Sequence, residues 1–425
     1  MRELAPILRP SRGGLASVYL LAVSIAATSG CDRGNPTAPA ARLGAETSSS
    51  EPRNHTAAAL RPIDADEGQR FAEAFESAVY RSDPSVVTRM IDWETLFRTA
   101  TDGIAGSEGF RESFIQGALS KQGELAIQLS QAVADGGSFH LLRFYSEKDE
   151  RRALFRLLQP GSGVKYQELI LGRDAAGEVR AVDIYIFLSG ERLSHTMRRM
   201  YLLAAAEQPG RPLDNIISPE NEFIKHTAEF QQMASHLRGG NPQQTVEIYQ
   251  TLPASMQQEK TVMLLYVQAA SSIGDDLYAQ AIDDFRAVHA RDACVDMVSI
   301  DGHLLRKEYD RALEAIARVD TAVGGDPYMN VLRANINLMR GEYAVAESFA
   351  KMAIDQEPGL VDPYWTLVMV SLFQRSFADT AKWLTVMHEK FRIEFEDLQT
   401  IPDYAEFVKS SEYEAWQATL AKVER

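Results

Sequence analysis

Cysteine is almost absent from this chain of 425 residues, which contains only Cys31 and Cys294. A framework of several disulfides is therefore excluded, and the folded parts must be stable through packing. We expect Cys294 to be a buried structural thiol, because it stands near the start of a predicted helix. Catalytic motifs are missing as well: there is no G-x-S-x-G, no H-E-x-x-H, no P-loop and no paired C-x-x-C. The eight histidines are scattered, so we expect no metal, no cofactor and no enzyme.

Positive charge is also in short supply. The chain has 44 Lys and Arg against 59 Asp and Glu, which gives a net charge of −15. No basic stripe with interleaved aromatic residues occurs, so nucleic acid is not an expected partner. The acidic balance instead favours solubility and disfavours nonspecific contact with anionic lipid.

The N-terminal region is typical of an export signal. Three arginines among the first 12 residues precede the apolar run Leu15–Ala27, which is shorter than the roughly 20 residues of a membrane-spanning helix. The sequence that follows, TSGC, resembles the bacterial lipobox, although Thr28 stands where Leu is usual. The resemblance implies that Cys31 is acylated and becomes the first residue of the mature chain. The alternative is ordinary secretion, with cleavage near Ala26 or Ala27.

This interpretation predicts where the protein is located. Residues 1–31 would be a lipoprotein signal, and the mature protein would face the periplasm or the cell exterior. Residues 32–63 are rich in Ala, Pro, Ser and Thr and show no apolar period. Such a composition cannot bury a core and predicts a flexible tether. The membrane would then be contacted through the lipid anchor only.

Aromatic residues recur at a fixed interval in the second half of the chain. Tyr309, Tyr343 and Phe377 are 34 residues apart, and a small residue follows each of them three positions later. These small residues are Ala312, Ala346 and Thr380. A recurrence at this period predicts an α-solenoid of stacked helix pairs, since no single pair can bury its apolar face alone.

The unit from Asp326 to Pro358 resembles the tetratricopeptide repeat. It has Ala334 in its first helix, Gly341 and then an aromatic residue at its turn, alanines in its second helix and a closing proline. Neighbouring units match the spacing of the repeat better than its residue types; Lys307, for example, stands where Gly is usual. We predict repeats over 221–393 and a helical cap over 394–425. The alternative is an unrelated helical bundle with chance spacing.

The resemblance implies a concave binding surface lined by the first helix of each pair. Carrying the register over places there Tyr266, Met297, Asp301, Tyr328, Asn335, Trp365 and Met369. This set is aromatic and rich in Met, so we expect an apolar segment of a partner protein to dock there, with Trp365 as an anchor. The alternative is that several of these side chains pack against the next repeat.

Residues 64–207 have a different pattern. Asp66 can cap a helix that runs to Tyr80, and a long helix is predicted from Ser107 to about Ala134. Four extended segments then follow, over 139–146, 151–158, 164–171 and 179–188, with turn residues between them. A final helix over 191–206 precedes a linker at 208–220. Helices followed by a four-stranded antiparallel sheet predict an α+β domain, which loosely resembles the cystatin-like and nuclear-transport-factor-like folds.

That resemblance leaves a second function open. Some members of this group are enzymes with a pocket, and His140, Glu168, Asp183 and Tyr185 lie on the predicted strands, where they could act as acid and base. The alternative is an exposed polar sheet face. The leading hypothesis is a membrane-tethered scaffold for an unknown protein or peptide. The second is an exported enzyme or ligand-binding protein with its pocket in 64–207.

Overall fold

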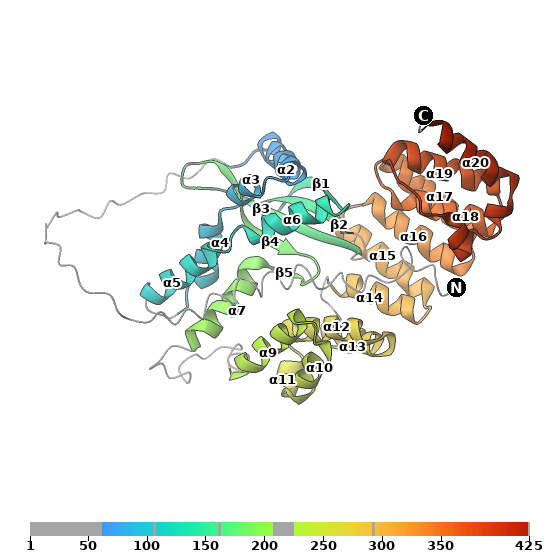
Figure 1. The fold of residues 1–425 in the computed structure, drawn as a ribbon. Helices are drawn as coiled ribbons and strands as arrows, with labels where there is room; N and C mark the ends of the chain where they lie inside the picture. Colours follow the sequence, from blue (N-terminus) through green and yellow to red (C-terminus); the bar gives the residue numbers. More distant parts are fainter. Residues whose placement is uncertain (1–61, 105–107, 160–162, 207–224, 291–293, 424–425) are drawn as a thin grey trace, which may run out of the picture. The chain divides into compact units, whose positions relative to one another are not determined.

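The computed structural model describes residues 62–104, 108–159, 163–206, 225–290 and 294–423 (Figure 1). Cys31, the predicted signal, most of the predicted tether and the linker at 208–220 lie outside these described residues. The described chain divides into two compact units, the first ending at Leu265 and the second starting at Tyr266. Within the described ranges, no helix is long and apolar enough to cross a membrane.

Helices open the first unit. They are α2 (Ala65–Tyr80), α3 (Pro84–Arg89), α4 (Trp93–Thr101), α5 (Glu108–Leu119) and α6 (Glu124–Ala134). The cap of α2 is Asp64 and not Asp66, because the Asp64 carboxylate accepts the Glu67 backbone N–H at 2.8 Å. The single helix predicted over 107–134 is also wrong, since the chain turns between α5 and α6 and α6 starts after Gly123.

An antiparallel sheet follows. Its strands are β1 (Ser138–Glu147), β2 (Glu150–Gln159), β3 (Gly163–Arg173), β4 (Val179–Ile186) and β5 (Glu191–Arg192), in that spatial order. Four of them were predicted. The fifth strand has only two residues, which pair with Tyr185 and Ile186, and two residues are too few to show an alternating pattern. The helix predicted to start at Glu191 therefore starts later, as α7 (Leu193–Ala206).

One face of the sheet packs on α2. Phe139 and Phe155 stack with ring centroids 4.8 Å apart, and Phe75 of α2 lies 6.0 and 5.6 Å from them. All three rings are buried. Because side chains alternate along a strand, the opposite face receives Tyr145, Arg152 and Glu168. The face opposite α2 thus carries a cluster of hydrogen-bonded polar groups.

The remaining elements are helical. The first unit continues with α9 (Thr227–Arg238), α10 (Pro242–Thr251) and α11 (Ala254–Gln257), and the boundary between the units falls within α12 (Lys260–Ile273). The second unit contains α13 (Asp275–His289), α14 (Cys294–Leu305), α15 (Tyr309–Val323), α16 (Pro327–Arg340), α17 (Tyr343–Gln356), α18 (Asp362–Phe373), α19 (Phe377–Phe391) and α20 (Ser411–Val423). An α+β part followed by a helical C-terminal part agrees with the prediction at that level. Cys294 is buried, as predicted.

The 34-residue period of the sequence is also a period of backbone geometry. The turns that join α14 to α15, α16 to α17 and α18 to α19 have positive φ at Lys307 (59°), Gly341 (79°) and Arg375 (57°). In each turn the next residue caps the second helix, with φ of −84° and ψ between 61° and 69°. The N–H of this capping residue donates to the carbonyl five residues earlier, at 2.8 to 2.9 Å. The small residues Ala312, Ala346 and Thr380 are completely buried.

The C-terminal segment covers the last helices of this unit. Between α19 and α20 the chain forms three short 3₁₀ turns, Leu398–Thr400, Pro402–Tyr404 and Phe407–Lys409. An apolar residue occurs at every third position there, at Phe395, Leu398, Ile401, Tyr404 and Phe407. This spacing matches the three residues per turn of a 3₁₀ helix. These side chains join one apolar cluster with residues of α18 and α19.

Candidate binding surfaces

The seven residues predicted to line a groove lie on the first helices of the pairs. Tyr266 is on α12, Met297 and Asp301 are on α14, Tyr328 and Asn335 on α16, and Trp365 and Met369 on α18. Their exposure differs. Tyr266, Tyr328 and Met369 are buried, whereas Met297, Asp301, Asn335 and Trp365 are partly exposed. Only the second group has side-chain surface that a partner could contact.

Three of the partly exposed residues also bridge neighbouring elements. The Tyr278 hydroxyl of α13 donates to Asp301 Oδ2 at 2.9 Å, and the Thr366 hydroxyl of α18 donates to Asn335 Oδ1 at 2.7 Å. The Trp365 ring packs edge to face on Phe395, with 6.0 Å between the centroids. These contacts join successive helices and the C-terminal segment, so the residues contribute to the stack. Whether they also bind a partner stays a prediction.

Asp301 has unusual electrostatics for a carboxylate on this surface. Burial raises its pKa to about 6, although the hydrogen bond from Tyr278 acts in the opposite direction. The pKa of Tyr278 is raised as well, by burial and by the negative charge of Asp301. Asp301 thus disfavours the charged form of Tyr278, whereas the Tyr278 hydroxyl favours the charged form of Asp301.

The four candidate acid–base residues of the sheet are engaged in separate contacts. His140 Nδ1 lies 2.8 Å from Glu76 Oε1 of α2. Asp183 is buried and accepts from the Ser194 hydroxyl at 2.5 Å and from the Ser194 N–H at 3.2 Å. Glu168 accepts from the Tyr145 hydroxyl and from Arg152. Tyr185 is the cross-strand neighbour of Glu168, and its ring lies 5.3 Å from that of Phe187.

A network of charges on this face was not foreseen from the sequence. Arg152 lies within 2.7 to 2.9 Å of Glu147, Glu150 and Glu168. Burial alone would raise the pKa of Glu150, but hydrogen bonds from Arg152 and Arg192 outweigh it and lower that pKa. The three carboxylates thus share two guanidinium groups, those of Arg152 and Arg192. This network could not be predicted, since the strand register that brings these residues together is set by tertiary structure.

A buried lysine was missed for the same reason. Lys165 on β3 is 4% exposed, and its Nζ donates to Gln159 Oε1 at 3.0 Å. Burial lowers the pKa of this amine to about 8. The Gln159 amide supplies a hydrogen bond but no opposite charge.

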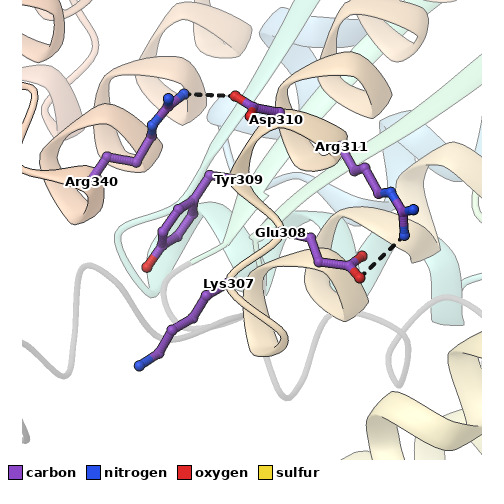
Figure 2. A pocket seen from close by; sticks show the side chains of 6 residues that line it. All are labelled: Lys307, Glu308, Tyr309, Asp310, Arg311 and Arg340. Carbon is purple, nitrogen blue, oxygen red and sulfur yellow. Dashed lines mark hydrogen bonds and ion pairs between the residues drawn. The ribbon is translucent and has the colours of Figure 1, made fainter.

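A hollow of about 320 Å³ lies at the turn between α14 and α15 (Figure 2). It is lined by Lys307, Glu308, Tyr309, Asp310, Arg311 and Arg340. Arg340 comes from α16 and pairs with Asp310 at 2.9 Å, and Arg311 pairs with Glu308 at 3.2 Å. Sequence reasoning singled out Lys307 and Tyr309 as turn residues and did not predict a hollow beside them.

Among the residues that the structure describes, no group of three or more His, Cys, Asp or Glu side chains is arranged to hold a metal ion. Comparison with known protein families, with curated proteins and with solved structures finds no match to this chain.

Proposed function

We propose that this protein is an exported, membrane-tethered scaffold that binds another polypeptide through a tetratricopeptide-type array of helix pairs. The observation that supports this most is the repetition of one turn geometry at Lys307, Gly341 and Arg375. Stacked helix pairs of this period offer an extended surface along which a polypeptide can lie. The partner is a protein or peptide segment and not a nucleic acid.

The proposed binding surface consists of the exposed parts of the first helices. Met297 and Asn335 are partly exposed on α14 and α16. On α18 nine of the twelve residues are buried, and the ring of Trp365 packs on Phe395. We therefore place the centre of the partner site on α14 and α16 and no longer on Trp365.

The alternative of acid–base chemistry in the sheet has less support. The carboxylates of Glu168 and Asp183 are buried and accept hydrogen bonds from neighbouring side chains. A general base has to reach the proton of a substrate within hydrogen-bond distance. The contacts of both groups are those of structural carboxylates.

The tether is the second part of the proposal and rests on the sequence. Acylation of Cys31 would hold the folded units at the membrane surface through residues 32–63. If so, the protein partitions into detergent and is labelled by palmitate, and Cys31→Ser releases it into the soluble fraction. An unchanged soluble protein with its N-terminus at Ala27 or Thr28 would contradict the anchor.

The binding function is tested by purification from detergent-solubilised membranes. The wild-type chain is compared with a variant carrying Met297→Glu and Asn335→Arg, both on partly exposed positions. A matched control carries Glu73→Arg on an exposed position of α2 and Gln69→Glu on a partly exposed position of the same helix. We expect a partner polypeptide with the wild type and the control and its loss with the first variant. Equal recovery from all three would contradict a site on α14 and α16.

A further inference from the structure

The C-terminal segment binds at the third of the three equivalent turns. Arg375 Nη2 lies 3.9 Å from Glu406 Oε2, and the ring of Phe407 lies 5.9 Å from that of Phe377. Phe407 is completely buried. A cation at the turn and an aromatic residue two positions later therefore hold a dipeptide of one acidic and one aromatic residue, Glu406-Phe407.

The second turn is filled differently. Gly341 offers no side chain, and the ring of Tyr343 stacks on Phe373 of α18 with 5.8 Å between centroids and 20° between planes. The aromatic residue of this turn thus has a ring partner within the repeat array itself.

The first turn has the residue types of the third turn but no occupant. Lys307 and Tyr309 correspond to Arg375 and Phe377, and the φ values of Lys307 and Arg375 are 59° and 57°. The residue that corresponds to Phe373 is Met339. Within the described residues, no ring stacks on Tyr309 and no carboxylate pairs with Lys307. The hollow of about 320 Å³ lies beside these two side chains (Figure 2).

We propose that this hollow binds a segment of a partner polypeptide in which an acidic residue precedes an aromatic residue. The partner's ring would stack on Tyr309, as Phe373 stacks on Tyr343, and its carboxylate would reach the Lys307 ammonium, as Glu406 reaches Arg375. Arg340 supplies a second cation, because its partner Asp310 has a side chain that is 85% exposed and holds it weakly. The inference rests on the proposed function in that both use the helical unit, but it concerns the turn between α14 and α15 with the last residues of α16, and not Met297 and Asn335.

The probe is a synthetic peptide with the sequence of residues 401–410, IPDYAEFVKS, which contains Glu406-Phe407. It is titrated against the full chain carrying Cys31→Ser, and binding is followed by fluorescence anisotropy. We expect saturable binding that weakens at high salt, because one contact is an exposed ion pair. A peptide with Glu406→Ala and Phe407→Ala is expected not to bind. Absence of saturable binding up to about 1 mM peptide would overturn the proposal. A dissociation constant above that value corresponds to a binding free energy weaker than about 4 kcal/mol.

Variants of the hollow locate the binding. Met339→Phe places a ring where the next repeat has Phe373, so it should weaken binding by about tenfold, the upper range of an aromatic pair. Lys307→Glu should weaken it by about fivefold, which corresponds to about 1 kcal/mol. Lys351→Glu makes the same charge change at an exposed position of α17 and should leave the affinity unchanged.

The same affinity for Met339→Phe and the wild type would assign the peptide to another surface and overturn the proposal. If the protein is a dimer that the peptide dissociates, the hollow is supported and a second copy is identified as the donor of the segment. The capture experiment changes Met297 and Asn335 and leaves Met339 unchanged. Failure of the hollow would therefore leave the proposed function standing, and failure of the capture experiment would leave the hollow standing.

Discussion

The hydroxyl of Tyr278 donates a hydrogen bond of 2.9 Å to the carboxylate of Asp301, and this bond joins α13 to α14. Because Asp301 is partly shielded from water, burial raises its pKa from 3.8 to about 6. The folded chain thus binds a proton at this site more tightly than the unfolded chain does. The stabilisation from that proton is complete below about pH 4 and is lost as the pH rises through 6.

The first prediction concerns Asp301→Asn. Asparagine keeps an acceptor for the Tyr278 hydroxyl and removes the charge, so the variant should be more stable than the wild type at pH 7.5, by on the order of 1–2 kcal/mol. The difference should be much smaller at pH 4.5, where the aspartate is protonated. Urea unfolding at both pH values measures it. A difference that is the same at both pH values would show that Asp301 is not the group responsible.

The second prediction concerns the left-handed turn residues. Lys307 has φ of 59°, which costs about 1–2 kcal/mol for a residue with a Cβ, and glycine loses about 0.5–1 kcal/mol more chain entropy on folding. Lys307→Gly should therefore stabilise the protein by about 0.5–1 kcal/mol. Gly341→Ala should destabilise it by about 1 kcal/mol, although no atom lies within 4 Å of the added Cβ. Thermal unfolding that moves both variants in the same direction would contradict this account.

The third prediction concerns the contact between the two helices of a pair. Ala346 is completely buried where α16 and α17 pack together, so Ala346→Leu should overpack the contact and cost about 1–3 kcal/mol. Ala344→Leu is the matched control, because Ala344 is exposed on the same helix. Leucine is a good helix former at either position, so propensity does not explain a difference. Equal unfolding temperatures for the two variants would mean that the register of this pair is wrong.

The fourth prediction concerns Trp365. Its ring packs on Phe395, which in turn packs on Trp416 at 5.7 Å. Trp365→Ala should therefore destabilise the helical unit by about 2 kcal/mol, less than for a fully buried ring because Trp365 is partly exposed. Trp365→Phe should restore most of the loss. If Trp365→Ala greatly weakened partner binding and left the free energy of unfolding unchanged, Trp365 would instead be part of the binding surface.

The sequence predicted those elements whose signal is local and repeated. The starts of α15, α17 and α19 at Tyr309, Tyr343 and Phe377 could be read from the sequence, because the same pattern of buried small residues recurs three times. The positive φ of Lys307 could not, since a lysine does not indicate a left-handed turn and the flanking helices impose it. Glu168 and Tyr145 are 23 residues apart in sequence, and only the strand register brings them together. The ring contact between Trp365 and Phe395 was missed because Phe395 belongs to the C-terminal segment, whose 3₁₀ spacing was not recognised.

The central claim is that α14 and α16 hold another polypeptide. It is tested most directly by a photo-crosslinking amino acid placed at Asn335 in cells, with the same amino acid at Glu73 of α2 as the control. The account predicts a crosslinked adduct with one defined polypeptide at position 335, absent at position 73 and lost when Met297→Glu is added. Irradiation that gives no adduct at position 335, or the same adducts at both positions, would contradict it.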